Sequence, residues 1–392
     1  MNKKISINEV LFLTVFGFWF LITSFRITQW NGIFNFDGLT AVSKYMLYAL
    51  AVYMFFAETR KSVFRIIVSI VFVAFSYLVT NTSGFKMIFI ISLFLVSAYD
   101  VDYKKIFKLS IAILIIVMLI TVAAVGIGII ENKNWGTPGR DRYSMGYNYC
   151  TYLAYVIMFI SFMYMTIREN ITKFEGIMIC IFQVVVFIFT RTNTTLIITI
   201  CVMFSYLFIN CFFKKIPRIV AVLGTLFPTM ACAISYWGHA LYDANNPIWF
   251  KINTLLSTRL ELGYKAVQDY RITLLGQKIK WIGWGTMAKH PNWGPERYNN
   301  VDSFFLRALL TYGIIYTFII VIGFSIVIYY AYKQDNKGMF WATIGMVIFG
   351  IVDTEMIDMR FQPFVLLIAC VIAIKNKKSL ENENVTYKKD FL

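Results

Sequence analysis

Long apolar runs recur along the whole chain and constrain its fold more than any other feature. Of the 392 residues, 59% are hydrophobic and only 15% are charged, whereas soluble domains carry roughly 25% charged residues. Many of these runs are long enough to cross about 30 Å of hydrocarbon as α-helices. The first run, from Val10 to Phe25, is expected to be a full span and not a cleavable leader. The sequence therefore predicts an all-α polytopic integral membrane protein.

Apolar runs and the charged breaks between them predict about twelve transmembrane helices. Lys and Arg cluster at alternate connections, for example at 60–65, 104–108 and 214–218. The positive-inside rule places such connections, and with them both termini, on the cytoplasmic side. The predicted spans are residues 8–25, 39–57, 63–80, 86–99, 109–130, 150–167, 176–190, 196–213, 219–236, 303–332, 338–353 and 363–375.

One large extracytoplasmic segment interrupts this series. The predicted organisation is nine helices in 1–236, the large segment at 237–302, three helices in 303–375 and a cytoplasmic tail at 376–392. The segment is neither low in complexity nor strongly charged, so we expect it to fold against the membrane. No internal repeat is evident, which weighs against transporters built from duplicated halves.

The net charge of +16 follows from the cytoplasmic connections and does not indicate nucleic-acid binding. The six cysteines lie in or beside apolar runs without CxxC spacing, so neither a disulfide framework nor a zinc site is expected. The two histidines, His239 and His290, have no partner at metal-ligand spacing. We expect no metal and no cofactor.

Within the large segment, LLSTRLELGYKAVQDYRITLLGQ contains Thr258 and Glu261 at the spacing of a capping box. This pattern predicts a helix that begins near Thr258 and carries Arg259 in its first turn. Unpaired N–H groups at a helix start attract anions, and a guanidinium there adds a forked donor. The segment therefore predicts an anion site, although an ordinary solvated arginine is the alternative.

Arg191 interrupts an apolar stretch, FIFTRTNTTLII, near the expected outer boundary of the membrane. A guanidinium at that depth is costly and normally faces a cavity or a partner. It is expected either to bind an anion that enters from the lipid or to be a loop arginine that reaches the interface. Arg140 and Arg142, with Asp141 between them, form a second basic cluster on the same side, or a solvated loop with a local ion pair. Converging arginines suggest a polyanionic headgroup such as pyrophosphate.

Asp302 ends the large segment where the chain re-enters the membrane. It is a candidate to orient or deprotonate an attacking hydroxyl, and it is also a candidate N-cap of the next span. His290 is a candidate second acid or base, and the alternative is a loop histidine without a chemical role. Trp293 and Tyr298, with Trp281 and Trp284, are candidates for sugar stacking, although aromatic residues are also enriched at membrane interfaces. No nucleotide-binding motif occurs on the cytoplasmic side, so nucleotide sugars are not the expected donors.

Four stretches together resemble the Wzy-type polysaccharide polymerases, which are relatives of the O-antigen ligases. RYSMGYNYCTYLAYV (142–156) resembles the family's Arg, Gly and Asn leading into a span, and it adds Tyr143 and Asn148 to the candidate substrate-binding residues. FIFTRTNTTLIITI (187–200) resembles its short turn with Thr or Ser before Arg. The Arg259 segment resembles its Arg-led outer helix, and VDSFFLRALLTYGIIY (301–316) resembles its re-entry segment.

The resemblance implies a metal-independent glycosyltransferase with a GT-C-type fold in the bacterial cytoplasmic membrane. It would move a growing glycan from undecaprenyl pyrophosphate onto the next lipid-linked repeat unit at the outer face. Flippase and chain-length-regulator proteins are the partners that it implies. Arg191 and Arg259 match arginines thought to grip the pyrophosphate. Ligase relatives place a His before Asn where this chain has Asp302 and Ser303, which favours a polymerase; a ligase for another acceptor and a flippase remain the alternatives.

Overall fold

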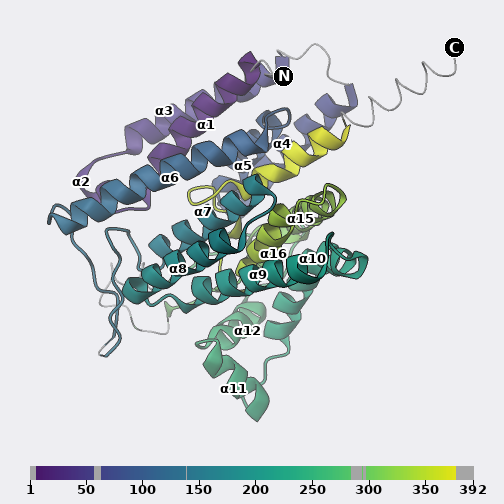
Figure 1. The fold of residues 1–392 in the computed structure, drawn as a ribbon. Coiled ribbons are helices and arrows are strands. Elements are labelled where there is room, and N and C mark those ends of the chain that lie inside the picture. The colour runs from purple at the N-terminus through teal and green to yellow at the C-terminus, as the bar shows by residue number, and fades with distance from the viewer. Residues whose placement is uncertain (1–5, 57–62, 138, 284–293, 295–296, 377–392) are drawn as a thin grey trace.

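The computed structural model describes residues 6–56, 63–137, 139–283, 294 and 297–376, and helices dominate this part of the chain (Figure 1). No β-strand occurs within those ranges, where only isolated bridges are found. The helices are α1 (Ile7–Arg26), α2 (Trp30–Ile33), α3 (Asp37–Phe56), α4 (Val63–Ser83), α5 (Met87–Ser97), α6 (Tyr103–Gly126), α7 (Tyr152–Arg168), α8 (Lys173–Thr190), α9 (Asn193–Phe212), α10 (Arg218–Ala240), α11 (Pro247–Leu255), α12 (Arg259–Asp269), α14 (Phe304–Thr311), α15 (Gly313–Lys333) and α16 (Lys337–Val352), followed by the 3-10 turns η2 (Glu355–Ile357) and η3 (Phe364–Leu366).

Eight described helices are long and apolar enough to cross a membrane, namely α1, α3, α4, α6, α8, α9, α10 and α15. Four shorter apolar helices, α5, α7, α16 and Phe364–Asn376, complete the set. The chain is thus a polytopic helical protein of the membrane, as its apolar runs predict. Every predicted span overlaps one of these helices, while the number of twelve crossings remains a prediction. The predicted tail lies outside the described residues from position 377 onward.

The helices are packed so that alternate connections meet at two opposite ends of the bundle. At one end, the starts of α1, α4, α6 and α16 meet the ends of α7 and α9. The contacts there are Lys105 to Glu9 at 2.6 Å, Lys104 to Glu169 at 2.5 Å, Arg65 to Asp100 at 3.1 Å, and Lys337 to Asn210 at 2.7 Å. We call this region, defined by those residues, the paired end.

The other end gathers the connections 27–36, 191–192 and 353–363 with the described parts of 127–151 and 241–303, and we call it the loop end. Backbone hydrogen bonds join these connections: Asn148 N–H to Ile27 O at 3.0 Å, Tyr143 N–H to Phe189 O at 3.0 Å, and Phe304 N–H to Asp353 O at 3.1 Å. The Thr82 hydroxyl donates to Leu275 O at 2.6 Å. All candidate arginines of the sequence therefore lie at one end of the bundle.

The predicted span 303–332 is interrupted, because two helices, α14 and α15, occupy it. Gly313 adopts a positive φ of 84° between them and packs against the backbone of Gly276, which has a φ of 85°. A side chain at either position would collide with the other segment's backbone, and positive φ is accessible mainly to glycine. The close approach of two glycines thus separates a short buried helix, α14, from the long span that follows.

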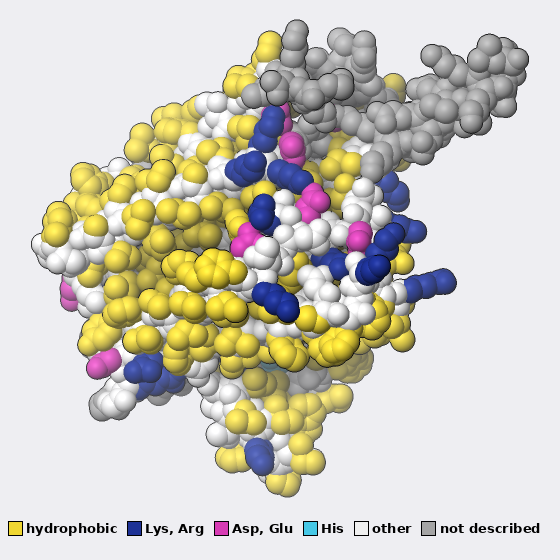
Figure 2. Space-filling model, in the orientation of Figure 1, with side chains coloured by type: hydrophobic (Ala, Val, Ile, Leu, Met, Phe, Trp, Pro, Cys, Tyr) yellow, Lys and Arg dark blue, Asp and Glu magenta, His cyan; other side chains and the backbone are white. Residues whose placement is uncertain are grey.

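Apolar side chains cover most of the visible face of the bundle, whereas charged side chains gather toward its ends (Figure 2). Inside, aliphatic residues pack together with many aromatic ones, and Phe94 contacts both Trp19 and Phe16 through tilted and edge-to-face rings. An apolar exterior around an apolar core is the arrangement expected when lipid replaces water as solvent.

Candidate functional site

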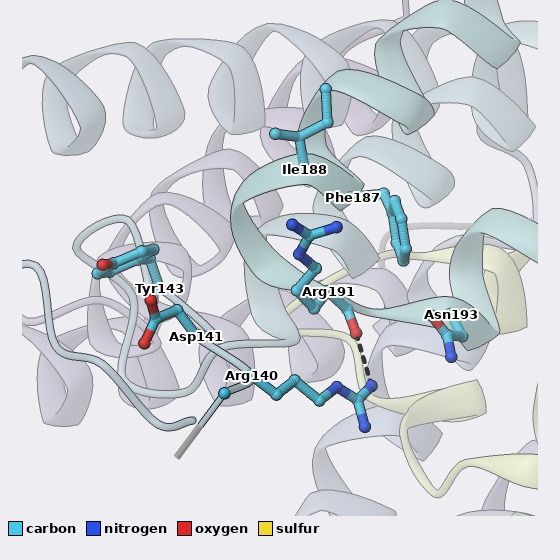
Figure 3. A pocket seen from close by; sticks show the side chains of 8 residues that line it. Arg140, Asp141, Tyr143, Phe187, Ile188, Arg191 and Asn193 are labelled. Carbon is cyan, nitrogen blue, oxygen red and sulfur yellow. Dashed lines mark hydrogen bonds between the residues drawn. The ribbon is translucent and has the colours of Figure 1, made fainter. Parts of the chain in front are cut away.

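A cavity of about 490 Å³ opens at the loop end beside the connection between α8 and α9. Its lining includes Arg140, Asp141, Tyr143 and Arg191 (Figure 3). The remaining lining residues are Gly139, Phe187, Ile188 and Asn193. Two guanidinium groups and one carboxylate give the lining an excess of positive charge. Three candidate residues from the sequence, Arg140, Tyr143 and Arg191, thus share one cavity.

Neither arginine of this cavity forms an ion pair with a carboxylate of the described residues. Asp141 instead accepts a hydrogen bond from the amide of Asn134 at 2.7 Å. The guanidinium of Arg191 lies 5.8 Å from the centre of the Phe187 ring. Figure 3 shows Arg140 reaching from the other side, where it donates to the carbonyl of Arg191 at 3.2 Å.

Helix ends contribute to the same electrostatic environment. The last carbonyls of α8 lack donors within the helix. Two arginines of the preceding loop supply them: Arg142 donates to Thr190 O at 3.3 Å, and Arg140 donates to Arg191 O. Cations are favoured at this negative end of a helix dipole. Next to it, α9 begins after Thr192, whose side chain makes no capping bond. The uncapped start of α9 adds the positive end of a second dipole, which favours an anion.

Arg191 itself holds an unusual backbone conformation. It ends α8 in the left-handed region, with φ 49° and ψ 37°, and its N–H bonds to Phe187 O at 2.8 Å. Helices commonly end in this conformation, but glycine or asparagine usually occupies the position. A β-carbon there costs about 1–2 kcal/mol. The chain thus keeps an arginine where glycine would be more stable.

Arg259 lies in a second group of polar residues at the loop end. Its guanidinium forms an ion pair with Asp302 at 3.0 Å, and both side chains are more than two-thirds buried. Asp302 also accepts from the Asn300 amide at 2.6 Å. Burial acts to lower the pKa of Arg259, but the carboxylates of Asp302 and Asp353 outweigh it and raise that pKa. Arg259 is therefore a firmly charged group with a carboxylate beside it.

The start of α12 differs from the predicted capping box, which was wrong. The helix begins at Arg259 as expected, but Thr258 adopts a left-handed conformation and its side chain caps nothing. Asn253 in α11 takes that role, since its Oδ1 accepts from the N–H groups of Leu260 at 3.1 Å and Glu261 at 3.2 Å. Glu261 pairs with Lys265 at 2.7 Å. A cap supplied by another helix could not be found from local spacing.

The N-cap role predicted as an alternative for Asp302 was also wrong. Ser303 caps α14, with its hydroxyl accepting from Leu306 N–H at 3.4 Å. The Asp302 carboxylate is consequently left to bond Arg259 and Asn300.

Asp353, which the sequence analysis did not single out, lies close to the same pair. It follows the last residue of α16, is buried, and accepts a hydrogen bond from the hydroxyl of Tyr155. Burial raises its pKa to about 6, with a further contribution from Asp302, against the hydrogen bond from Tyr155 and the charge of Arg259. The only sequence signal for Asp353 is its position as a carboxyl at the end of the apolar predicted span 338–353.

A further cluster occupies the 353–363 connection. Arg360 forms a forked ion pair with Asp358 and lies 4.0 Å from Glu355. Burial and the neighbouring Asp358 raise the pKa of Glu355. The pKa of Asp358 is lowered, because the charge of Arg360 outweighs the effect of burial. The Arg360 carbonyl accepts from Ser24 at 3.5 Å, so this cluster ties the connection to α1.

The charges that act on Tyr149 come from two groups, the 139–142 loop with Arg142 and the Arg259 group with Asp302. Burial raises the pKa of this tyrosine to about 12. Burial and Asp302 also raise the pKa of Tyr298, on which Tyr149 and Arg259 act as well. The two polar groups of the loop end are thus neighbours, although Arg259 does not line the Arg191 cavity.

The remaining predicted residues have other positions. Asn148 donates its amide to Arg26 O at 2.9 Å and so ties the loop to the end of α1. Trp281 lies over Arg307 and donates to the Thr311 hydroxyl at 3.0 Å. His290, Trp284 and Trp293 lie outside the described residues.

Fold and site together define a polytopic helical membrane protein with arginines and carboxylates gathered at one end. A scan against models of known protein families finds no match, and a search of curated proteins finds no significant relative.

Proposed function

We propose that the protein is a membrane glycosyltransferase that polymerises a polysaccharide from repeat units carried on undecaprenyl pyrophosphate. The observation that carries this proposal is the contrast between two neighbouring groups at the loop end. One has Arg140 and Arg191, which form no ion pair with a carboxylate of the described residues, and the other has carboxylates held around Arg259. The arginines are suited to bind a diphosphate, and the carboxylates around Arg259 are suited to activate a hydroxyl.

The Arg191 cavity supports a site for the diphosphate. Arginine binds phosphate oxygens through a planar fork of donors, and within the described part of the chain no carboxylate competes for either arginine of this cavity. The uncapped start of α9 adds to the attraction. Exposed Ile188 and neighbouring apolar residues of α8 border the cavity, so a polyprenyl tail could remain in lipid while its headgroup reaches the arginines.

The Arg259 group supports activation of the acceptor. In the proposed reaction, the terminal hydroxyl oxygen of one lipid-linked repeat attacks the anomeric carbon of the glycan on the other. The bond from that carbon to the pyrophosphate oxygen breaks, and its electron pair leaves with undecaprenyl pyrophosphate. The hydroxyl proton passes to Asp302. Arg259 holds this carboxylate in place, as Asn300 does from the other side.

Arginine charge stabilises the departing diphosphate, since its negative charge grows as the bond breaks. The proposal needs no metal for this step. It places the loop end at the outer face of a bacterial cytoplasmic membrane, with the paired end and both termini in the cytoplasm. Flippase and chain-length-regulator proteins are the partners proposed for such a reaction.

The test is to supply purified protein with a lipid-linked repeat unit and to separate the products by size. Polymerisation predicts a ladder that is absent in folded Arg191→Ala and Arg259→Ala variants. A single enlarged product on a different acceptor would instead identify a ligase. Movement of the substrate across a vesicle membrane without any ladder would identify a flippase.

A further inference from the structure

Helix α11 exposes large apolar side chains although it lies outside the candidate membrane-spanning helices. Ile248 is 69% exposed, Phe250 60% and Leu255 76%. Asn253 is the only buried residue of this helix, and α11 packs mainly against α12. Ile248, Ile252 (37% exposed) and Leu255 follow the spacing i, i+4, i+7 and share one face of α11, whereas Phe250 lies on the opposite face. A contiguous apolar face on a segment outside the spans indicates contact with another apolar phase.

The preceding helix supplies the continuation of this surface. Exposed apolar residues recur every three or four positions along α10 and onto the residue after it, and they are Leu226, Met230, Ile234, Trp237 and Leu241. Because α10 is itself apolar enough to span the membrane, this stripe is lipid-facing. Tryptophan is enriched where hydrocarbon meets headgroups, and the exposed Trp237 marks that level just before α11 begins.

The composition and position of α11 agree with the same level. Lys251 is its only charged residue, and a lysine stem can lie along apolar surface while its ammonium reaches the headgroups. In Figure 1, α11 and α12 form a lobe that projects sideways from the bundle beneath α9 and α10. Figure 2 shows hydrophobic side chains over much of this lobe.

We propose that α11 is an interfacial helix, with Ile248, Ile252 and Leu255 buried in the lipid leaflet at the loop end. The lipid is favoured over a second copy of the chain because the apolar surface continues the lipid-facing stripe of α10. Amphipathic helices of this kind lie in the plane of the membrane with their apolar side near the acyl chains.

This placement has a consequence for Arg259. Asn253 joins α11 to the start of α12, where Arg259 is the first residue, and its amide also donates to the Tyr242 hydroxyl at 3.1 Å. The depth of α11 in the leaflet therefore sets the height of Arg259 above the hydrocarbon. The inference does not depend on the proposed reaction.

The experiment places a nitroxide spin label at Leu255→Cys, and separately at Ile248→Cys, in full-length protein reconstituted in lipid nanodiscs. The exposed Cys201 and Cys211 are first replaced by Ala. Gln268→Cys is the matched control, because this exposed polar residue lies on α12 in the same lobe. Collision with oxygen, which concentrates in lipid, is compared with collision with a water-soluble nickel complex.

We expect both α11 labels to collide with oxygen several-fold more, relative to nickel, than the Gln268 label does. Two labels guard against failure of one variant to fold. Preference for nickel at both α11 positions would overturn the proposal. So would protection from both reagents with magnetic coupling between labels, which would indicate a second copy of the chain on this surface.

Discussion

The paired end and the Arg191 cavity hold their cations in different ways, although the loop end also contains the ion pairs of Arg259 with Asp302 and of Arg360 with Asp358. At the paired end, Lys104 and Lys105 each contact a carboxylate of another helix, and Arg65 contacts Asp100. At the loop end, Arg140 and Arg191 line a cavity and contact no carboxylate of the described residues. Paired cations join helices together, whereas cations without partners are available to bind an anion. This difference is the strongest physical indication of where the protein works.

The largest effect is expected from Asp302→Asn, which keeps the shape of the side chain but removes its capacity to accept a proton. Loss of a general base costs about 10²–10⁴-fold in rate, so the product ladder should shorten to traces at equal protein and substrate. The initial rate of glycan transfer measures this. A rate within threefold of the original protein would exclude Asp302 as the base.

Arg191→Gly sharpens the comparison, because glycine suits the left-handed backbone at this position. The substitution should leave the thermal unfolding midpoint equal or slightly raised, while transfer falls about 10²–10³-fold through loss of one charged donor. Arg191→Lys, which keeps the charge but not the fork, should retain intermediate activity. Unfolding of the glycine variant at lower temperature would show that Arg191 has a structural role.

Asp353→Asn tests the buried carboxyl behind Arg259. Because the pKa of Asp353 is raised from 3.8 to about 6, the folded state binds its proton more tightly than the unfolded state does. Stability is therefore lost as pH rises through this interval, by at most about 3 kcal/mol. The original protein should lose thermal stability between about pH 4 and pH 6, and the variant should lose less. Equal pH profiles would contradict the account of this residue.

The smallest effect on activity is expected at the paired end. Lys105→Met removes the ion pair with the buried Glu9, which is 2.6 Å away, and should lower stability by about 1–3 kcal/mol because the carboxylate loses its cation. Transfer should stay within about twofold of the original rate when measured below the unfolding temperature. A loss as large as that of Arg191→Gly would remove the distinction between the two ends.

Several of these features follow from the sequence, since apolar length and charged breaks depend on residues close in the chain. They predict the order of the helices and a common end for Arg140, Arg191 and Arg259. Local spacing could not predict that Asn253 caps α12, nor that Asp353 meets Tyr155 across the bundle. Both contacts are made by helices that tertiary packing brings together. The left-handed backbone of Arg191 has no sequence signal, because an arginine there replaces the expected glycine or asparagine.

The central claim is that Arg140 and Arg191, which pair with no carboxylate of the described residues, hold a lipid diphosphate at the loop end. The most direct test is native mass spectrometry of the detergent-solubilised protein with added undecaprenyl pyrophosphate, comparing the original chain, Lys105→Met and Arg191→Gly. We predict that the first two retain one lipid equally and that Arg191→Gly needs at least tenfold more lipid for the same occupancy. Equal retention by all three proteins would contradict the claim.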